Sequence, residues 1–176
     1  MAIAQAPLNL DPRYATDAAS ERVNRLLYQR LVEFDASYQA VPGLASWQVV
    51  TPKHYRFTLN QAAKFHTGQT LVANDVKATY ESLLALRDAP HRAEFAHIQK
   101  IEVHDVNTLS FYLSKEDKHF VEKLIIGILP APQIAQGHDF SRSPIGSGPM
   151  KFVRWQSALT LARVRDGQQI VFTEVK

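Results

Sequence analysis

Helical and hairpin patterns follow one another irregularly along this chain, and their order limits the folds open to it. Apolar residues recur at helical spacing over residues 20–33 and again over 75–86. Alternation of apolar and polar residues predicts hairpins at 46–59 and 98–113, and three more strands within 150–175. A doubly wound parallel sheet would need a helix between successive strands. The sequence therefore predicts an α+β fold with a mixed sheet, hairpins and a few helices.

The composition is that of an ordinary globular protein. The chain has 176 residues, of which 45% are hydrophobic and 21% charged, and its net charge is +3. The two signs alternate along the sequence, so neither nucleic acid nor an anionic membrane is indicated as a partner. The longest apolar run, residues 124–131, is too short to cross a bilayer, and we expect no direct membrane insertion. The absence of cysteine is compatible with an oxidising compartment but does not identify one.

The segment after Pro12 is the strongest candidate for a binding site. Pro12 fixes φ and favours an extended Asp11, and the chain then enters the first predicted helix. Backbone N–H groups and the Thr16 hydroxyl are therefore expected to point out of a loop at a helix N-terminus, where electron-rich groups are favoured. The alternative is that these residues only cap the helix, since Thr16, Asp17 and Ser20 are all candidate N-caps.

Motif spacing does not support catalysis or metal binding. His66 lies in a predicted turn without a second ligand at metal-site spacing, so a hydrogen bond to the backbone is its more ordinary role. His97 and His104 would face opposite sides of one strand. The sequence has no Gly-x-Ser-x-Gly, no cysteine nucleophile and no His-Glu-x-x-His. We therefore expect no catalytic residue, no metal and no cofactor.

A glycine-rich stretch, Ile-Gly-Ser-Gly-Pro at residues 145–149, could be mistaken for a phosphate-binding loop. It lacks the length and the Lys-Ser/Thr of such a loop, and it leads into a strand instead of a helix. We interpret it as a tight crossing, where glycines allow two backbone segments to approach closely.

Six short signatures occur in order along the chain. They are LNLDP (8–12), LLYQRLVEFD (26–35), VPGLASWQV (41–49), YRFTL (55–59), KFHTGQTLVANDV (64–76) and SPIGSGPMKFVRW (143–155). Together they resemble the extracellular solute-binding proteins of bacterial peptide and nickel ABC importers, solute-binding family 5. Members of that family are much longer than 176 residues and close two lobes around a ligand.

The resemblance implies the N-terminal lobe portion of a two-lobed, type II-like periplasmic binding protein, with the C-terminal lobe absent. Residues 1–35 and 143–176 would form the hinge-proximal part of the large lobe, and residues 36–142 would be an inserted small subdomain.

In this family the loop that corresponds to Thr16, Asp17 and Ala18 lines the cleft and touches the ligand, which is peptide-like or another small polar molecule. The resemblance also implies an ABC permease in the inner membrane as a partner, and a periplasmic or extracellular location. Because the N-terminus has no basic region followed by an apolar core, we expect a secretion signal to have been removed before Met1.

Two alternatives stay open at this point. Some bacterial transcription regulators carry a ligand-sensing domain built on the same fold, although this sequence contains no helix-turn-helix. The other is a stand-alone interaction domain without a cleft. The sequence departs from the family pattern at Val72, where relatives usually place a Thr and where Asn74 is the substitute N-cap. It also lacks the usual Tyr-Trp pair around residues 163–169. These departures leave the ligand class open.

Overall fold

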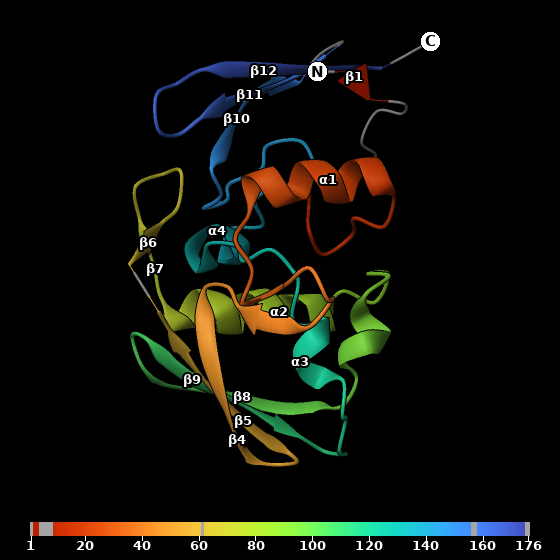
Figure 1. Ribbon diagram of the computed structural model, residues 1–176, viewed down its shortest axis with the longest axis vertical. Coiled ribbons are helices and arrows are strands. Elements are labelled where there is room, and N and C mark those ends of the chain that lie inside the picture. The colour runs from red at the N-terminus through yellow and green to blue at the C-terminus, as the bar shows by residue number, and fades with distance from the viewer. Residues whose placement is uncertain (1, 4–8, 61, 156–157, 175–176) are drawn as a thin grey trace.

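The computed structural model describes residues 2–3, 9–60, 62–155 and 158–174 (Figure 1). The helices are α1 (Ala18–Leu27), α2 (Ala73–Ala85), the 3₁₀ helix η1 (Arg92–Phe95), α3 (Phe120–Lys123) and α4 (Ala131–Ala135). The strands of the two larger sheets are β1 (Ala2–Ile3), β4 (Ala45–Thr51), β5 (His54–Leu59), β8 (Ile98–Asp105), β9 (Thr108–Leu113), β10 (Met150–Trp155), β11 (Leu159–Arg163) and β12 (Gln169–Glu174). Two short hairpins are formed by β2 (Val32–Phe34) with β3 (Ala40–Pro42), and by β6 (Ala63–Lys64) with β7 (Thr70–Leu71).

Two four-stranded sheets lie at opposite ends of the molecule in Figure 1. One has the order β4-β5-β9-β8 and is antiparallel throughout, and its pairs β4-β5 and β8-β9 are the two predicted hairpins. The other has the order β1-β12-β11-β10, in which β1 pairs with β12 in parallel. Helices α1, α4 and α2 lie between the two sheets. The predicted α+β class is confirmed, and the three closing strands lie where alternation placed them, although residue 175 falls outside the described part.

Helix α1 is shorter than predicted. It begins after Asp17, and it ends at Leu27 because Tyr28 adopts an extended conformation (φ −123°, ψ 145°). Leu31 and Val32, which continue the helical spacing in sequence, instead lie in strand β2 and the loop before it, where both are fully buried. The burial of these two residues against a different core decides where the helix ends, so the prediction of a helix to about residue 33 was wrong.

Helix α2 begins one residue after Val72, which has no polar side chain to cap it. Asp75, in the first turn of the helix, caps it instead. Its Oδ2 accepts a hydrogen bond of 2.8 Å from the backbone N–H of Val72. The prediction that Asn74 caps the helix was therefore wrong. A carboxylate in the first turn can satisfy a free N–H as an N-cap would, and it also suits the positive end of the helix dipole.

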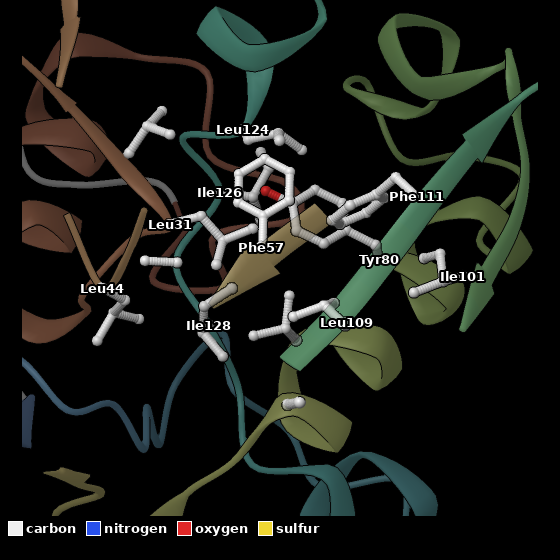
Figure 2. Packing of buried hydrophobic residues seen from close by; sticks show 14 of the residues in the cluster. Leu31, Leu44, Phe57, Tyr80, Ile101, Leu109, Phe111, Leu124, Ile126 and Ile128 are labelled. Carbon is white, nitrogen blue, oxygen red and sulfur yellow. The ribbon is translucent and has the colours of Figure 1, made fainter. Parts of the chain in front are cut away.

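The larger core lies between α2 and the sheet β4-β5-β9-β8. Phe111 is at its aromatic centre, with edge-to-face contacts to Phe57 and Tyr80 at centroid distances of 5.4 and 5.5 Å (Figure 2). It makes a third such contact, to Phe120, at 5.5 Å. Leu31, Leu124, Ile126 and Ile128, which lie outside the sheet in sequence, complete this core (Figure 2). Edge-to-face packing adds about 0.5–1.5 kcal/mol per pair to the burial of each ring.

The smaller core packs α1 against β10, β11 and β12. Its buried members come from both ends of the chain and from the segment around α4: Leu10, Val23, Leu27, Tyr28, Leu129, Phe140, Met150, Leu159, Leu161 and Phe172. Residues 31–32 and 124–128 belong to the larger core, whereas Leu129 and Phe140 belong to the smaller one. The division of the chain into two cores thus falls close to Tyr28–Leu31 and between Ile128 and Leu129.

The glycine stretch is the tight crossing that the sequence predicted. The N–H of Gly148 donates to the carbonyl oxygen of Leu27 at 2.8 Å. A Cβ added at Gly146 would lie 2.0 Å from that same oxygen, and one added at Gly148 would lie 2.4 Å from the carbonyl oxygen of Leu26. No side chain fits between these backbones, so the end of α1 and the entry to β10 come together only because both positions are glycine.

A set of hydrogen bonds, here called the seam, joins α2 and the β6–β7 hairpin to the segment 129–148. Asp75 Oδ1 accepts from the N–H of Ala131 at 2.8 Å, and the Thr79 hydroxyl oxygen accepts from the N–H of Leu129 at 2.9 Å. His66 Nε2 donates to the carbonyl of Gly148 at 2.9 Å. Burial raises the pKa of Asp75, while its two backbone donors oppose that rise. The seam fixes the smaller core on the larger one.

Candidate functional site

The loop before α1 is built on a buried ion pair. Asp11 and Arg13 are 4% and 9% exposed, and the Asp11 carboxylate accepts from Arg13 Nη2 at 2.7 Å and from Nε at 3.0 Å. Asp11 Oδ1 also accepts from the backbone N–H of Arg13 at 3.0 Å, which closes a turn after Pro12. Two fork-like hydrogen bonds to one carboxylate make this a rigid pair, whose charges satisfy each other away from water.

Three side-chain hydrogen bonds tie this loop to α2 and the segment after it. Arg13 Nη1 donates to the Ser82 hydroxyl at 3.1 Å, and the Tyr14 hydroxyl donates to Asp88 Oδ1 at 2.9 Å. His91 Nε2 donates to the carbonyl of Ala15 at 2.6 Å, because a carbonyl oxygen can only accept. Residues 13–15 are therefore tied to this part of the chain by three separate hydrogen bonds, immediately before the predicted binding residues.

The predicted binding residues emerge from this scaffold at the surface. Thr16 and Ala18 are exposed and Asp17 is half-buried. Asp17 is the N-cap of α1, and its carboxylate accepts from the N–H of Ser20 at 2.9 Å. Of the three candidate caps the structure selects Asp17. This leaves Thr16 and Ala18 at the open end of the helix, where a solute could reach them. Contact between these residues and a solute stays a prediction.

His66 has the role that was predicted for a turn histidine, since it bonds the backbone of Gly148. Its Nδ1 is buried and has no hydrogen-bond partner in the part of the chain that the structure describes. Burial lowers the pKa of His66, and the Lys151 charge lowers it further, while the Gly148 hydrogen bond partly opposes both. Within the described residues, no group of three or more His, Cys, Asp or Glu side chains is placed to hold a metal ion.

Sequence reasoning missed the residues that support the loop. Ser82, Asp88 and His91 lie 69 to 76 positions away from their partners, and no local pattern marks them. A signal did exist for the ion pair, because an Asp-Pro-Arg sequence places opposite charges on the two sides of a turn. His54 and His104 were also not connected by sequence, yet both Nε2 atoms bond the Ser110 hydroxyl, at 2.9 and 2.8 Å.

Comparison with known proteins identifies the family. Residues 39–170 match the family described as bacterial extracellular solute-binding proteins, family 5 Middle. The chain belongs to this family. Its members bind solutes and are not enzymes, which agrees with the expectation of no catalytic site. No helix in the described part of the chain is long and apolar enough to cross a membrane.

The relatives include a binding protein and a transcription regulator. The chain is 30% identical to "Di/tripeptide-binding protein 1" of Pseudomonas aeruginosa, over 86% of this chain and 34% of that protein. It is also 30% identical to the "HTH-type transcriptional regulator SgrR" of Yersinia pestis, over 83% of this chain and 26% of that protein. The chain thus spans between about a quarter and a third of the length of the curated relatives it matches.

A solved structure shares the fold. The oligopeptide-binding protein AppA from Bacillus subtilis, in complex with a nonapeptide, superposes with a TM-score of 0.89 at 23% sequence identity. The match covers 99% of this chain and 39% of that one. The fold is therefore that of a portion of a periplasmic binding protein, as predicted.

Proposed function

We propose that this chain supplies one wall of a solute-binding cleft in a substrate-binding protein of a bacterial ABC importer. Thr16, Asp17 and Ala18 would form that wall, and a second lobe would form the other. Solute binding would then favour a closed arrangement of the two lobes through a hinge motion. The proposal extends to a periplasmic or extracellular location and to an ABC permease as the partner.

The observation that carries the proposal is the contrast between residues 13–15 and residues 16–18. The first three are held by Ser82, Asp88 and His91, whereas Thr16 and Ala18 are exposed at the N-terminus of α1, on either side of the half-buried Asp17. A rigid loop that leads into an exposed helix N-terminus suits the carboxylate or carbonyl groups of a peptide-like solute. The family and its di- and tripeptide-binding relative support the same class of ligand.

The two cores support a refined division of the chain. We propose that the segment up to about Tyr28 and the segment from about Leu129 onward belong to the hinge-proximal lobe. The residues between them would form the inserted subdomain. The sequence-based limits at 35/36 and 142/143 stay predictions, and core membership favours moving both boundaries toward the N-terminus.

The proposal is tested by titrating this chain with L-alanyl-L-alanine and following backbone amide shifts by NMR. We expect shifts at residues 16–18. The dissociation constant should lie above the submillimolar range, because half of the cleft's contacts are missing. Thr16→Val should weaken binding by about threefold through loss of one hydrogen bond, while Thr67→Val, at an exposed turn threonine, should not. Submillimolar affinity by calorimetry would contradict a half-site, and shifts that spare residues 16–18 would contradict this wall.

A second candidate function is a ligand-sensing domain of a transcription regulator, which the similarity to SgrR favours. The same wall would serve, but the output would be DNA binding by another part of the protein. Sequencing the gene upstream of this region separates the two, because an export signal supports transport and a helix-turn-helix supports regulation.

A further inference from the structure

A pocket of about 200 Å³ lies along one side of α1, next to the loop but without Thr16, Asp17 or Ala18 in its lining. Its wall on the helix side is formed by Glu21, Asn24 and Arg25, which share one face at i, i+3 and i+4 spacing. Ile125 and Ile126 from the larger core, together with His91, form the opposite side. The pocket is thus a gap between the two packed units.

The apolar lining of this pocket is continuous and stiff. Pro12, Tyr28, Ile126 and Gly127 line it, and Tyr28 is held in place because its hydroxyl donates to the carbonyl of Leu10 at 2.9 Å. A Cβ at Gly127 would lie 2.5 Å from the Tyr28 Cβ, so the chain passes as closely as backbone allows. A preformed apolar surface of this size suits an aliphatic group of a few carbons.

Two opposite charges at the rim are not used by the protein itself. Glu21 and Arg25 are exposed and one helical turn apart, and neither side chain forms an ion pair or hydrogen bond with a residue in the described ranges. The other charged groups of the lining are engaged, since Arg30 bonds the Glu33 carboxylate and Glu94 lies 3.4 Å from His91 Nδ1. Glu21 and Arg25 therefore offer a carboxylate and a guanidinium to a bound molecule.

Asn24, between these two residues on the helix, provides a second observation. It is 8% exposed, and its Oδ1 is buried without a hydrogen-bond partner in the described part of the chain. A buried acceptor without a donor is unfavourable, and native proteins seldom leave one. An ammonium group bound beside Glu21 would bring N–H donors to the same wall. After rotation of its side-chain amide, Asn24 could accept a hydrogen bond from one of them.

We propose that this pocket is a second, small-molecule site that binds an aliphatic amino acid zwitterion. Arg25 takes the carboxylate, Glu21 takes the ammonium group, and the side chain rests on Tyr28 and Ile126. The site needs no second lobe, because both units that form it are present in this chain. It is thereby separate from the proposed cleft wall at residues 16–18.

The probe is L-leucine, titrated into this chain and followed by amide shifts. We expect shifts at residues 125–127 with a Kd on the order of 1 mM, as befits a ligand of so few atoms. 3-Methylbutylamine, which lacks the carboxylate, and 4-methylpentanoate, which lacks the ammonium group, should each bind roughly tenfold more weakly. If either analogue matches leucine, or if residues 125–127 do not shift at about ten times that Kd, the proposal is overturned.

Variants of exposed helix residues assign the two charges. Arg25→Gln should weaken the binding of leucine and of 4-methylpentanoate by roughly tenfold and leave the binding of 3-methylbutylamine unchanged. Glu21→Gln should weaken the binding of leucine and of 3-methylbutylamine by roughly tenfold and leave the binding of 4-methylpentanoate unchanged. Arg22→Gln is the matched control, an exposed arginine on the same helix outside the pocket. Equal effects of Arg22→Gln and Arg25→Gln would refute the assignment. The cleft proposal is judged separately, because its own titration reads residues 16–18.

Discussion

The two cores of this molecule are assembled in different ways. The larger core draws on strands β4, β5, β8 and β9 and on α2, which follow one another within residues 45–113. The smaller core joins Leu10 and α1 to strands that begin at Met150, so it closes a loop of more than a hundred residues. Bringing distant segments together costs more chain entropy than pairing adjacent hairpins. The smaller core should therefore depend on the larger one for its support.

The seam shows how that dependence is built. Leu129 of the smaller core is held by Thr79, and the crossing at Gly148 is held by His66. Both supporting residues belong to the region that folds around the larger core. Loss of the larger core would remove both supports, whereas loss of the smaller core would leave the larger one with its own packing intact.

The largest expected effect comes from breaking each core in turn. Phe111→Ala should destabilise the larger core by about 3–5 kcal/mol, and Leu161→Ala should destabilise the smaller core by about 2–5 kcal/mol. Trp47 packs on the larger core and Trp155 on the smaller, so single-tryptophan variants report each by fluorescence during urea unfolding. We expect Phe111→Ala to lower the urea midpoints reported by both tryptophans. Leu161→Ala should lower only the midpoint reported by Trp155.

Two outcomes would break this comparison. If Leu161→Ala shifted both tryptophan transitions equally, the chain would be one cooperative unit with no hierarchy between its cores. If Phe111→Ala left the Trp155 transition unchanged, the smaller core would stand alone and the seam would be incidental.

A smaller effect is expected at the crossing between the cores. Gly146→Ala places a Cβ against the Leu27 carbonyl oxygen, a backbone atom that cannot move aside, and should cost about 3 kcal/mol. Gly68→Ala is the control, because Gly68 has a φ of +93° but open space around it. That change should cost only about 1–2 kcal/mol of backbone strain. Thermal or urea unfolding measures the stability lost in each variant. If Gly146→Ala and Gly68→Ala lost equal stability, backbone conformation, and not the close approach to Leu27, would be the reason for glycine at position 146.

The smallest expected effect is a pH dependence at the seam. Because the pKa of His66 is lowered in the folded state, its contribution to stability is present above the ordinary histidine pKa of about 6.5 and is lost as the pH falls through that value toward the folded pKa. Urea midpoints at about pH 7.5 and about pH 5.5 should therefore differ less in His66→Gln than in the unmodified chain. His97→Gln, at an exposed histidine, is the control and should leave the difference unchanged.

Much of the fold was predictable because its signals are local. Hairpins at 46–59 and 98–113 follow from alternation of apolar and polar residues over a short stretch. The crossing at 145–149 follows from a glycine motif that lacks the features of a phosphate loop and leads into a strand. The family was also predictable, since six ordered signatures are together far more specific than any one of them. The family resemblance, not a signature, implied that residues 16–18 touch a ligand. The exposure of Thr16 and Ala18 could not be read from the signatures.

What the amino-acid sequence determined by itself is the set of elements and the family, because periodicity and motifs depend on near neighbours. Only the tertiary structure decided that α1 ends at Leu27, that Asp17 and not Thr16 caps it, and that His91 holds Ala15 from 76 positions away. These outcomes depend on which core a side chain enters and on which distant atom it meets. Such contacts exist only after the chain has folded, and no local pattern specifies them.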